Sequence, residues 1–326
     1  MTTTLSILDR PAADAATLLA WRIESFGSPE TMRLTALPLP SPGPGEVRLR
    51  IQAAGVGPWD AWVRAGRSAL PQPLPLTLGS DVAGEVEQVG PGVTGFAPGD
   101  QVFGLTNPRF TGGYATHGVF ANTGLAHRPS ALSTIEAASV PVVAVTAWQA
   151  LFEQARIRPG QTVLVHGAAG NVGAYAVQLA ALSGARVLAT AHAADLDAVR
   201  RLGAAAAFDC RAVRFEECAG PVDAVIDLVG GDVQARSFAV LRRGGVLVSA
   251  VVPPDLELAR RHGVRAEFFL VDVTTARLER LAGMFAAGVL SPRVGTVLPM
   301  AEAQIAHDML EGRRPKPRGK IVLRVE

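Results

Sequence analysis

The sequence predicts an α/β protein of two domains, one rich in β-strands and one built on a doubly wound parallel sheet. Three observations support this fold class. The 326 residues are too many for one simple core. Proline and glycine clusters separate short alternating segments early in the chain, whereas strands and helices alternate after Pro159-Gly160. Hydrophobic residues make up 48% and charged residues 18%, so the chain can bury a large core.

The first part of the chain is expected to form the β-rich domain. Residues 46–51 alternate between apolar and other side chains, which predicts a strand. Residues 81–89 and 100–104 predict two further strands, joined by the Gly/Pro-rich turn 90–99. Together these segments indicate a compact β-barrel-like domain. Residues 1–16 are expected to be an N-terminal extension outside the fold.

The sequence pattern changes at Ser133, where Ser-Thr-Ile-Glu136 has the pattern of a capping box. It opens an Ala-rich helix that reaches about Ala155, and Pro141 is expected to interrupt it. Strands and helices then alternate, which is typical of a parallel, doubly wound sheet. The predicted strands of this sheet are 162–166, 186–190, 223–228 and 245–251, and its predicted helices are 172–183 and 195–202. The end of the chain returns to a mixed pattern, with a helix expected at 275–287 and a final strand at 320–325.

A glycine-rich segment follows the first of these strands and reads Val163-Leu-Val-His-Gly-Ala-Ala-Gly-Asn-Val-Gly173. A buried strand leads into a turn that opens a helix, so backbone N–H groups and the positive helix end would face a pyrophosphate. Gly170 would let the backbone approach the phosphates, and Gly173 would let the helix pack closely. Ala168 replaces the first glycine of the usual pattern. The segment predicts dinucleotide binding rather than an ordinary tight turn, through Gly167, Ala168, Ala169, Gly170, Asn171, Val172 and Gly173.

The end of the second strand indicates which dinucleotide is bound. NAD enzymes usually carry Asp or Glu there, about 20 residues after the turn, to hold the ribose hydroxyls. Here the strand ends in Thr190, and Ala191 and His192 follow it. Because an acid would repel a 2′-phosphate, its absence favours NADPH, with Thr190 donating a hydrogen bond and His192 supplying a donor or a charge. Asp195 lies near enough to keep NADH open as an alternative.

Composition excludes several other classes of protein. A net charge of +2 with both signs dispersed argues against nucleic acid, and the basic run between residues 313 and 320 is interpreted as solvated surface. Cys210 and Cys218 are too few for a disulfide scaffold or a Cys-rich zinc site, which fits a reducing cytoplasmic setting. No apolar run reaches the roughly 18 residues of a membrane span, and no signal peptide is expected.

From about Leu18 onward the chain resembles the medium-chain dehydrogenase/reductase superfamily, in its zinc-lacking quinone oxidoreductase-like branch. The matching segments share the order and spacing of that family. They are Pro42-Gly-Pro-Gly-Glu-Val47, Leu78-Gly-Ser-Asp-Val-Ala-Gly-Glu-Val86, Gly112-Gly-Tyr-Ala115, Thr146-Ala-Trp-Gln-Ala-Leu151, His166 to Gly173, Leu241-Arg-Arg-Gly-Gly245 and Gly319-Lys-Ile-Val-Leu323. The resemblance implies a GroES-like catalytic domain from residues 17–137 and 268–326, with a Rossmann NADPH-binding domain inserted at 138–267. It also implies a homodimer.

Zinc-dependent relatives differ from this chain at their metal ligands. They carry Gly-His-Glu where this chain has Gly79-Ser80-Asp81, and they use an early catalytic cysteine that is missing here. The six histidines form no ligand-spaced pair, although a catalytic zinc needs three protein ligands. A metal-free site favours hydride addition to a small electrophilic acceptor, such as a quinone or an enone. Two alternatives stay open: a zinc-less aldehyde or carbonyl reductase, and a non-catalytic dinucleotide-binding regulatory protein.

The resemblance also places individual residues near the nicotinamide. Related reductases often show Asn-x-x-Asp followed by Tyr, but this chain has Gly57 and Trp62 at the Asn and Tyr positions. Trp62 is expected either to form an aromatic wall against a flat acceptor or to be a core residue. Asp60 and Tyr114 are expected to be structural. Thr146 is expected beside the nicotinamide, and Val229, Gly230, Ala250, Val251, Phe268, Phe269 and Leu270 line its pocket, while Lys320 is also assigned to cofactor binding.

Overall fold

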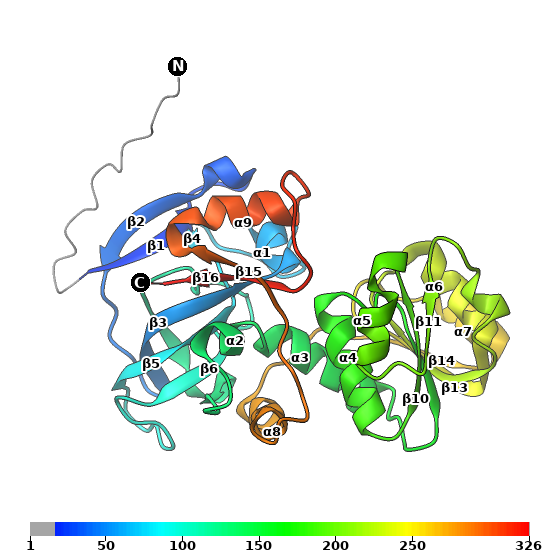
Figure 1. Cartoon of the computed structure of the whole chain (residues 1–326). Coiled ribbons are helices and arrows are strands. Elements are labelled where there is room, and N and C mark those ends of the chain that lie inside the picture. Colours follow the sequence, from blue (N-terminus) through cyan, green and yellow to red (C-terminus); the bar gives the residue numbers. More distant parts are fainter. Residues whose placement is uncertain (1–16, 326) are drawn as a thin grey trace. The chain divides into compact units, whose positions relative to one another are not determined.

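The computed structural model describes residues 17–325, which form two compact units, each drawn in Figure 1. The predicted extension 1–16 lies outside the described residues. The first unit comprises residues 17–128, 296–316 and 321–325, and the second comprises 129–295 and 317–320. The boundaries therefore differ from those predicted, because residues 129–137, 268–295 and 317–320 belong to the second unit. The reason is packing, since the helix at residues 275–286 lies against the helix at 141–148.

The first unit is built on two sheets. One has three strands in the order β2-β1-β4, and the other has the order β15-β16-β3-β5-β6-β8, with β7 also paired to β3. The pairs of β3 with β5, β7 and β16 are antiparallel. The strands are β1 Thr17–Ile23, β2 Arg33–Pro38, β3 Glu46–Val56, β4 Leu76–Thr77, β5 Asp81–Val89, β6 Gln101–Leu105, β7 His117–Ala121, β8 Leu125–His127, β15 Val294–Pro299 and β16 Lys320–Arg324, and the helices are α1 Pro58–Arg64 and α9 Ala303–Leu310. The predicted strands within β3, β5 and β6 are confirmed.

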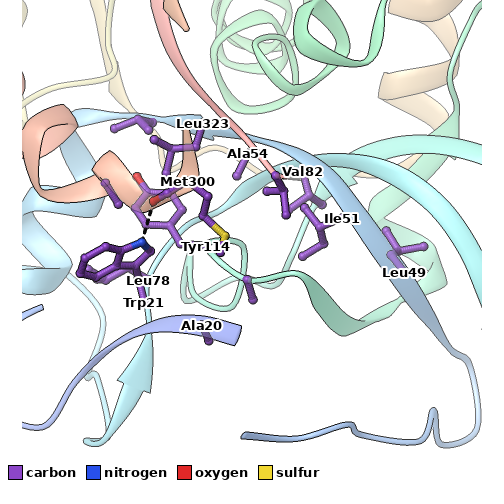
Figure 2. Packing of buried hydrophobic residues seen from close by; sticks show 14 of the residues in the cluster. Ala20, Trp21, Leu49, Ile51, Ala54, Leu78, Val82, Tyr114, Met300 and Leu323 are labelled. Atoms are coloured by element: carbon purple, nitrogen blue, oxygen red, sulfur yellow. Dashed lines mark hydrogen bonds between the residues drawn. The ribbon is translucent and has the colours of Figure 1, made fainter. Parts of the chain in front are cut away.

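The core of the first unit joins segments from both ends of the chain. Its buried cluster includes Trp21 of β1, Ile51 of β3 and Leu323 of β16 (Figure 2). The Trp21 indole Nε1 donates a hydrogen bond to the Met300 carbonyl oxygen at 2.6 Å, which is the dashed line in Figure 2. From Glu46 to Ala53 every second residue of β3 is buried, because successive side chains of a strand point to opposite faces, and residues 53–56 are all buried.

The second unit is built on a parallel sheet of six strands in the order β11-β10-β9-β12-β13-β14. The chain starts at the central strand β9, moves outward to β11, and then returns to the other side, which is the doubly wound topology that was predicted. Helices α4 and α5 lie on one side of the strands and α6 and α7 on the other (Figure 1). The strands are β9 Thr162–Val165, β10 Arg186–Ala191, β11 Ala206–Asp209, β12 Val222–Asp227, β13 Leu241–Ser249 and β14 Arg265–Phe268. The helices are α2 Thr134–Ala138, α3 Pro141–Trp148, α4 Asn171–Leu182, α5 Leu196–Arg201, α6 Gly231–Ser237, α7 Leu256–His262 and α8 Thr275–Ala286.

The helical segment before the parallel sheet agrees with its sequence signals. Ser133 Oγ accepts a hydrogen bond from the Glu136 N–H at 3.2 Å, and Glu136 Oε2 accepts one from the Ser133 N–H at 2.8 Å. This is the predicted capping box. The helix breaks before Pro141, as predicted, and α3 continues into a π-helical turn, Gln149–Gln154. No helix among residues 17–325 is long and apolar enough to cross a membrane.

Candidate dinucleotide-binding site

The glycine-rich turn lies between β9 and α4, at the carboxyl edge of the parallel sheet. The Gly170 N–H donates to the Gly167 carbonyl oxygen at 2.9 Å, and the Ala168 N–H donates to the Thr190 carbonyl oxygen of β10 at 3.1 Å. Gly170 is the N-cap residue of α4 and offers no capping side chain. The N–H groups of the first helical turn therefore have no side-chain cap, and they can bind an anion at the positive end of the helix.

Two glycines make the turn compact. A Cβ atom on Gly173 would lie 2.2 Å from the Gly167 carbonyl oxygen and 2.7 Å from the Ala168 Cα. Gly167 has a φ of +68°, which favours glycine. The start of α4 therefore packs directly on the turn, as predicted for Gly173. A bare backbone at a helix N-terminus is what a pyrophosphate requires, so these residues fit a dinucleotide.

A buried imidazole lies directly after β9 and supports the turn. His166 Nδ1 is 2.9 Å from Thr190 Oγ1, and Nε2 is 3.0 Å from Ser237 Oγ of α6. Burial lowers the pKa of His166 to about 4, so the ring is neutral at pH 7. Ser237 Oγ donates to the Val233 carbonyl oxygen at 2.6 Å, so it accepts the proton of Nε2. Nδ1 is then the acceptor, and the Thr190 hydroxyl donates to it.

This network corrects the predicted role of Thr190. Its side chain is buried, and its only hydroxyl proton is used inward by His166. It is therefore not available to donate to a 2′-phosphate. The sequence placed Thr190 correctly at the end of β10 but did not show which way the side chain is directed, because the partner histidine lies on a different strand.

Polar groups gather just beyond the end of β10. His192 is exposed, as its predicted role requires, and its Nδ1 lies 3.4 Å from Cys210 Sγ. Asp195 is buried, and Arg318 Nη2 lies 2.5 Å from its Oδ2. The Asp195 carboxylate, which left NADH as an alternative cofactor, is therefore neutralised by an ion pair. The sequence did not indicate this role of Arg318, because the two residues are far apart in the chain.

The predicted nicotinamide-lining residues lie at or just after the ends of β12, β13 and β14, whose carboxyl ends meet at one edge of the sheet. Val229 is 53% exposed and Val251 is 39% exposed, and a Cβ atom on Gly230 would lie 3.5 Å from Val251 Cγ2. The structure thus brings the loops after β12 and β13 together. Ala250 lies within the second of these loops.

The segment after β14 reaches the same edge. The Phe269 N–H is 3.4 Å from the Ser249 carbonyl oxygen of β13, to which it donates, and Phe268 and Leu270 are exposed. Phe268 and Leu270 are therefore not packed in a core. Lys320 is buried at the start of β16, where its N–H donates to the Arg293 carbonyl oxygen at 2.8 Å.

Trp62 and Thr146 lie in different units. Trp62, on α1 of the first unit, is 47% exposed, so the alternative of a core tryptophan is wrong. Thr146, on α3 of the second unit, is buried, and its hydroxyl donates to the Val142 carbonyl oxygen at 2.7 Å. Its side-chain proton therefore satisfies its own helix rather than a ligand.

Asp60 and Tyr114 form a structural contact, as predicted. The Tyr114 hydroxyl donates to Asp60 Oδ2 at 3.0 Å, and the Gly57 N–H donates to the same oxygen at 2.8 Å. Both side chains are fully buried. Burial, together with the negative charge of Asp60, raises the pKa of Tyr114 well above its usual value. The hydroxyl is therefore a poor proton donor for a substrate.

The described chain provides no obvious metal centre. Within residues 17–325, no three His, Cys, Asp or Glu side chains gather in a group that could hold a metal ion. Ser80, which stands at the histidine position of zinc-dependent relatives, accepts a hydrogen bond from Trp59 Nε1 at 2.7 Å. Cys210 and Cys218 are both free and exposed.

The glycine-rich turn and the start of α4, residues 167–173, form a glycine cradle. Such a cradle on a doubly wound sheet, together with an antiparallel unit, is typical of the class of dinucleotide-dependent oxidoreductases. Residues 43–131 match the family model of an alcohol dehydrogenase GroES-like domain, and residues 202–323 match that of a zinc-binding dehydrogenase. The quinone oxidoreductase of Rattus norvegicus is 31% identical over 321 residues, covering 93% of this chain and 97% of the relative. The solved quinone oxidoreductase from Coxiella burnetii has a TM-score of 0.88 at 31% identity, covering 95% of this chain and all of that chain. The CurK enoyl reductase has a TM-score of 0.83 at 25% identity, covering 95% of this chain and 99% of that one.

The chain therefore belongs to the medium-chain dehydrogenase/reductase superfamily, in its quinone oxidoreductase-like branch. The expected combination of a GroES-like domain with a Rossmann-type parallel sheet is confirmed. Family membership also makes the chain an oxidoreductase whose cofactor is a nicotinamide dinucleotide.

Proposed function

We propose that this oxidoreductase uses NADPH to transfer a hydride, without a metal, to a small quinone or enone acceptor. The observation that carries the proposal is the glycine cradle, in which α4 begins against the Gly167 carbonyl with no room for a side chain at Gly173. The cradle fits a pyrophosphate, and the groups beyond β10 then distinguish the two pyridine nucleotides.

The preference for NADPH is supported by the charges beyond β10. No acidic residue lies within the strand end formed by Thr190, Ala191 and His192. The next carboxylate along the chain, Asp195, is buried and paired with Arg318. Arg318 has a side chain that is 54% exposed, so its positive charge also faces solvent there. A 2′-phosphate would meet a cation and an exposed imidazole there, and the Asp195 carboxylate is already paired.

The choice of acceptor is supported by the proton donors. The two tyrosines of the chain, Tyr114 and Tyr175, are both buried, and the Thr146 hydroxyl donates to a helix carbonyl. Reduction of a simple aldehyde requires a positioned proton donor or a metal for the developing alkoxide. A quinone or an enone gives a stabilised anion that takes its proton from water. Bound NADPH would supply the hydride, and relatives named quinone oxidoreductase and enoyl reductase act on acceptors of these kinds.

In this proposal the protein contributes binding, orientation and exclusion of water. The first turn of α4 holds the pyrophosphate by its backbone N–H groups. The exposed side chains of Val229, Val251 and Leu270 would cover the nicotinamide and keep water from the reacting carbon. Trp62, exposed on α1, offers a flat surface to an aromatic acceptor.

The test is a titration with NADPH and NADH, followed by turnover with panels of quinones, enones and saturated aldehydes. We expect tighter binding of NADPH, turnover with the conjugated acceptors, and no loss of activity after treatment with a chelator. Faster reduction of saturated aldehydes would reject the acceptor class. Loss of activity that only a metal ion restores would reject the metal-free mechanism, and a lack of affinity for both nucleotides would reject the proposal.

We also propose that the protein forms a homodimer through the edge of the parallel sheet. β14 is the last strand in the sheet order, so within the described chain its outer edge has no neighbouring strand. Open strand edges are templates for pairing with another chain. Light scattering coupled to gel filtration should give twice the 34.0 kDa mass of the chain, and a mass of one chain would contradict this proposal.

A further inference from the structure

Asp227 is the last residue of β12, and its carboxylate is fully buried. Oδ1 accepts hydrogen bonds from the N–H groups of Val229 at 3.0 Å and Gly230 at 2.8 Å. Oδ2 accepts from Gln234 Nε2 at 2.9 Å and from Ser249 Oγ at 3.1 Å. An ionised carboxylate has about four acceptor positions, so these four donors use its full capacity.

The same network continues into the loop after β13. Ser249, the last residue of β13, accepts hydrogen bonds at its Oγ from the N–H groups of Val251 and Val252, both at 3.3 Å. Gln234 Nε2 also donates to the Val252 carbonyl oxygen at 3.1 Å. Gly230 has a φ of +78°, and a Cβ atom there would lie 3.1 Å from Val252 Cγ2. One carboxylate therefore ties loop 228–230 to loop 250–252.

The energetic balance of Asp227 points to a role beyond packing. Within residues 17–325 no cation forms an ion pair with it, although burial of an unpaired charge is costly. Hydrogen bonds to a charged acceptor, which are stronger than neutral ones, offset that cost. Above this buried polar base, Val229, Val251 and Val252 keep between 39% and 53% of their surface exposed. Apolar side chains held rigidly in solvent form a contact surface for a ligand.

We infer that Asp227 is a positioning residue for the nicotinamide half of the cofactor. It touches neither the cofactor nor the acceptor, and it acts by fixing loops 228–230 and 250–252, which the family resemblance places beside the nicotinamide. The inference rests on the proposed function. It predicts that weakening the hydrogen bonds to Asp227 impairs binding of the whole dinucleotide but not of its adenosine half.

The first variant is Asp227→Asn, which keeps the shape of the side chain and replaces one acceptor oxygen by a donor. That NH₂ group would face either Gln234 Nε2 and Ser249 Oγ or, after a flip, the two N–H groups of loop 228–230. The matched control is Asp255→Asn at the exposed N-cap of α7, because Asn caps a helix about as well as Asp.

The measurement is the Kd for NADPH and for adenosine 2′,5′-bisphosphate, at a temperature where circular dichroism shows folded protein. For D227N we expect the Kd for NADPH to rise by about tenfold or more, which is equivalent to about 1.4 kcal/mol of binding free energy. We expect less than a twofold change with adenosine 2′,5′-bisphosphate, and none with either ligand for D255N. A general structural defect would instead weaken both ligands together.

A second variant keeps the inference testable if D227N does not fold. Ser249→Ala removes the hydroxyl that holds the N–H groups of loop 250–252, but it leaves the Gln234 link to Val252 and the N–H groups of loop 228–230 on Asp227, so we expect a rise of about threefold in the NADPH Kd. An unchanged NADPH Kd in a folded variant, or an equal loss for both ligands, would overturn the inference. Absence of NADPH binding by the unaltered protein would instead reject the proposed function, and this inference with it.

Discussion

Replacing Gly173 by alanine should displace the glycine-rich turn and weaken cofactor binding. The added Cβ would lie 2.2 Å from the Gly167 carbonyl oxygen, whereas real Cβ atoms essentially never approach closer than 3.0 Å. The turn or the start of α4 must therefore move by about 0.8 Å. The opposing atoms belong to the backbone, so no side chain can rotate away to relieve the contact.

The magnitude follows from two effects. Overpacking of a close contact costs about 1–3 kcal/mol, and the better helix propensity of alanine returns up to about 1 kcal/mol. We therefore expect a net loss of about 1–2 kcal/mol in the free energy of unfolding of the second unit. A shift of this size misaligns the N–H groups that would hold the pyrophosphate. Loss of one or two such charge-assisted bonds should raise the NADPH Kd by roughly 10- to 100-fold.

The assay combines thermal unfolding with fluorescence titration of NADPH. Gly283→Ala is the matched control, because Gly283 is an exposed residue inside α8 and no atom lies within 4 Å of its added Cβ. That variant should gain about 1 kcal/mol in stability and bind NADPH as the unaltered protein does. If G173A bound NADPH with an unchanged Kd, the cradle would not be the pyrophosphate site.

Three further predictions concern buried polar groups. Thr190→Val should lower the free energy of unfolding by about 1–2 kcal/mol, because it leaves His166 Nδ1 without its donor. The ratio of NADPH to NADH affinity should change less than twofold, and a selective loss of NADPH affinity would instead show that Thr190 is a phosphate ligand. The contribution of neutral His166 to the free energy of unfolding should be fully present above pH 6.5 and should fall by about 3 kcal/mol as the pH drops toward 4, because His166 protonates near pH 6.5 in the unfolded chain but has a pKa of about 4 in the folded protein. Denaturant unfolding across this pH range would measure the loss, and a free energy of unfolding that does not change with pH would contradict the burial argument. Burial, and then the charge of Arg64, lower the pKa of His307 to about 3, and neither of its ring nitrogens has a hydrogen-bond partner among residues 17–325. The variant His307→Phe should therefore lose less stability in acid than the unaltered protein. An equal loss would exclude His307 as a source of acid sensitivity.

Local sequence signals predicted most of the second unit. The capping box at Ser133, the break at Pro141 and the strand, turn and helix around Gly170 all lie where they were expected. Each depends on residues a few positions apart, so the pattern is visible without the fold. β14 was not predicted, because two of its four residues are charged and an edge strand need not be buried on every side.

Contacts between distant segments explain what the sequence did not show. The predicted domain boundary at residue 268 was too early because α8 packs on α3, and the sequence does not encode that contact locally. The role of Thr190 was misjudged because the His166 acceptor comes from β9.

The sequence by itself predicted a site for a nucleotide-like anion, since a buried strand, a bare glycine turn and a helix start must meet wherever these residues fold in order. Only the tertiary structure decided which polar groups face that site. It paired Asp195 with Arg318, and it gathered four donors onto Asp227. The physical reason is range: glycine conformation and helix dipoles act within one turn of the chain, whereas ion pairs and buried hydrogen bonds join residues that become neighbours only after folding.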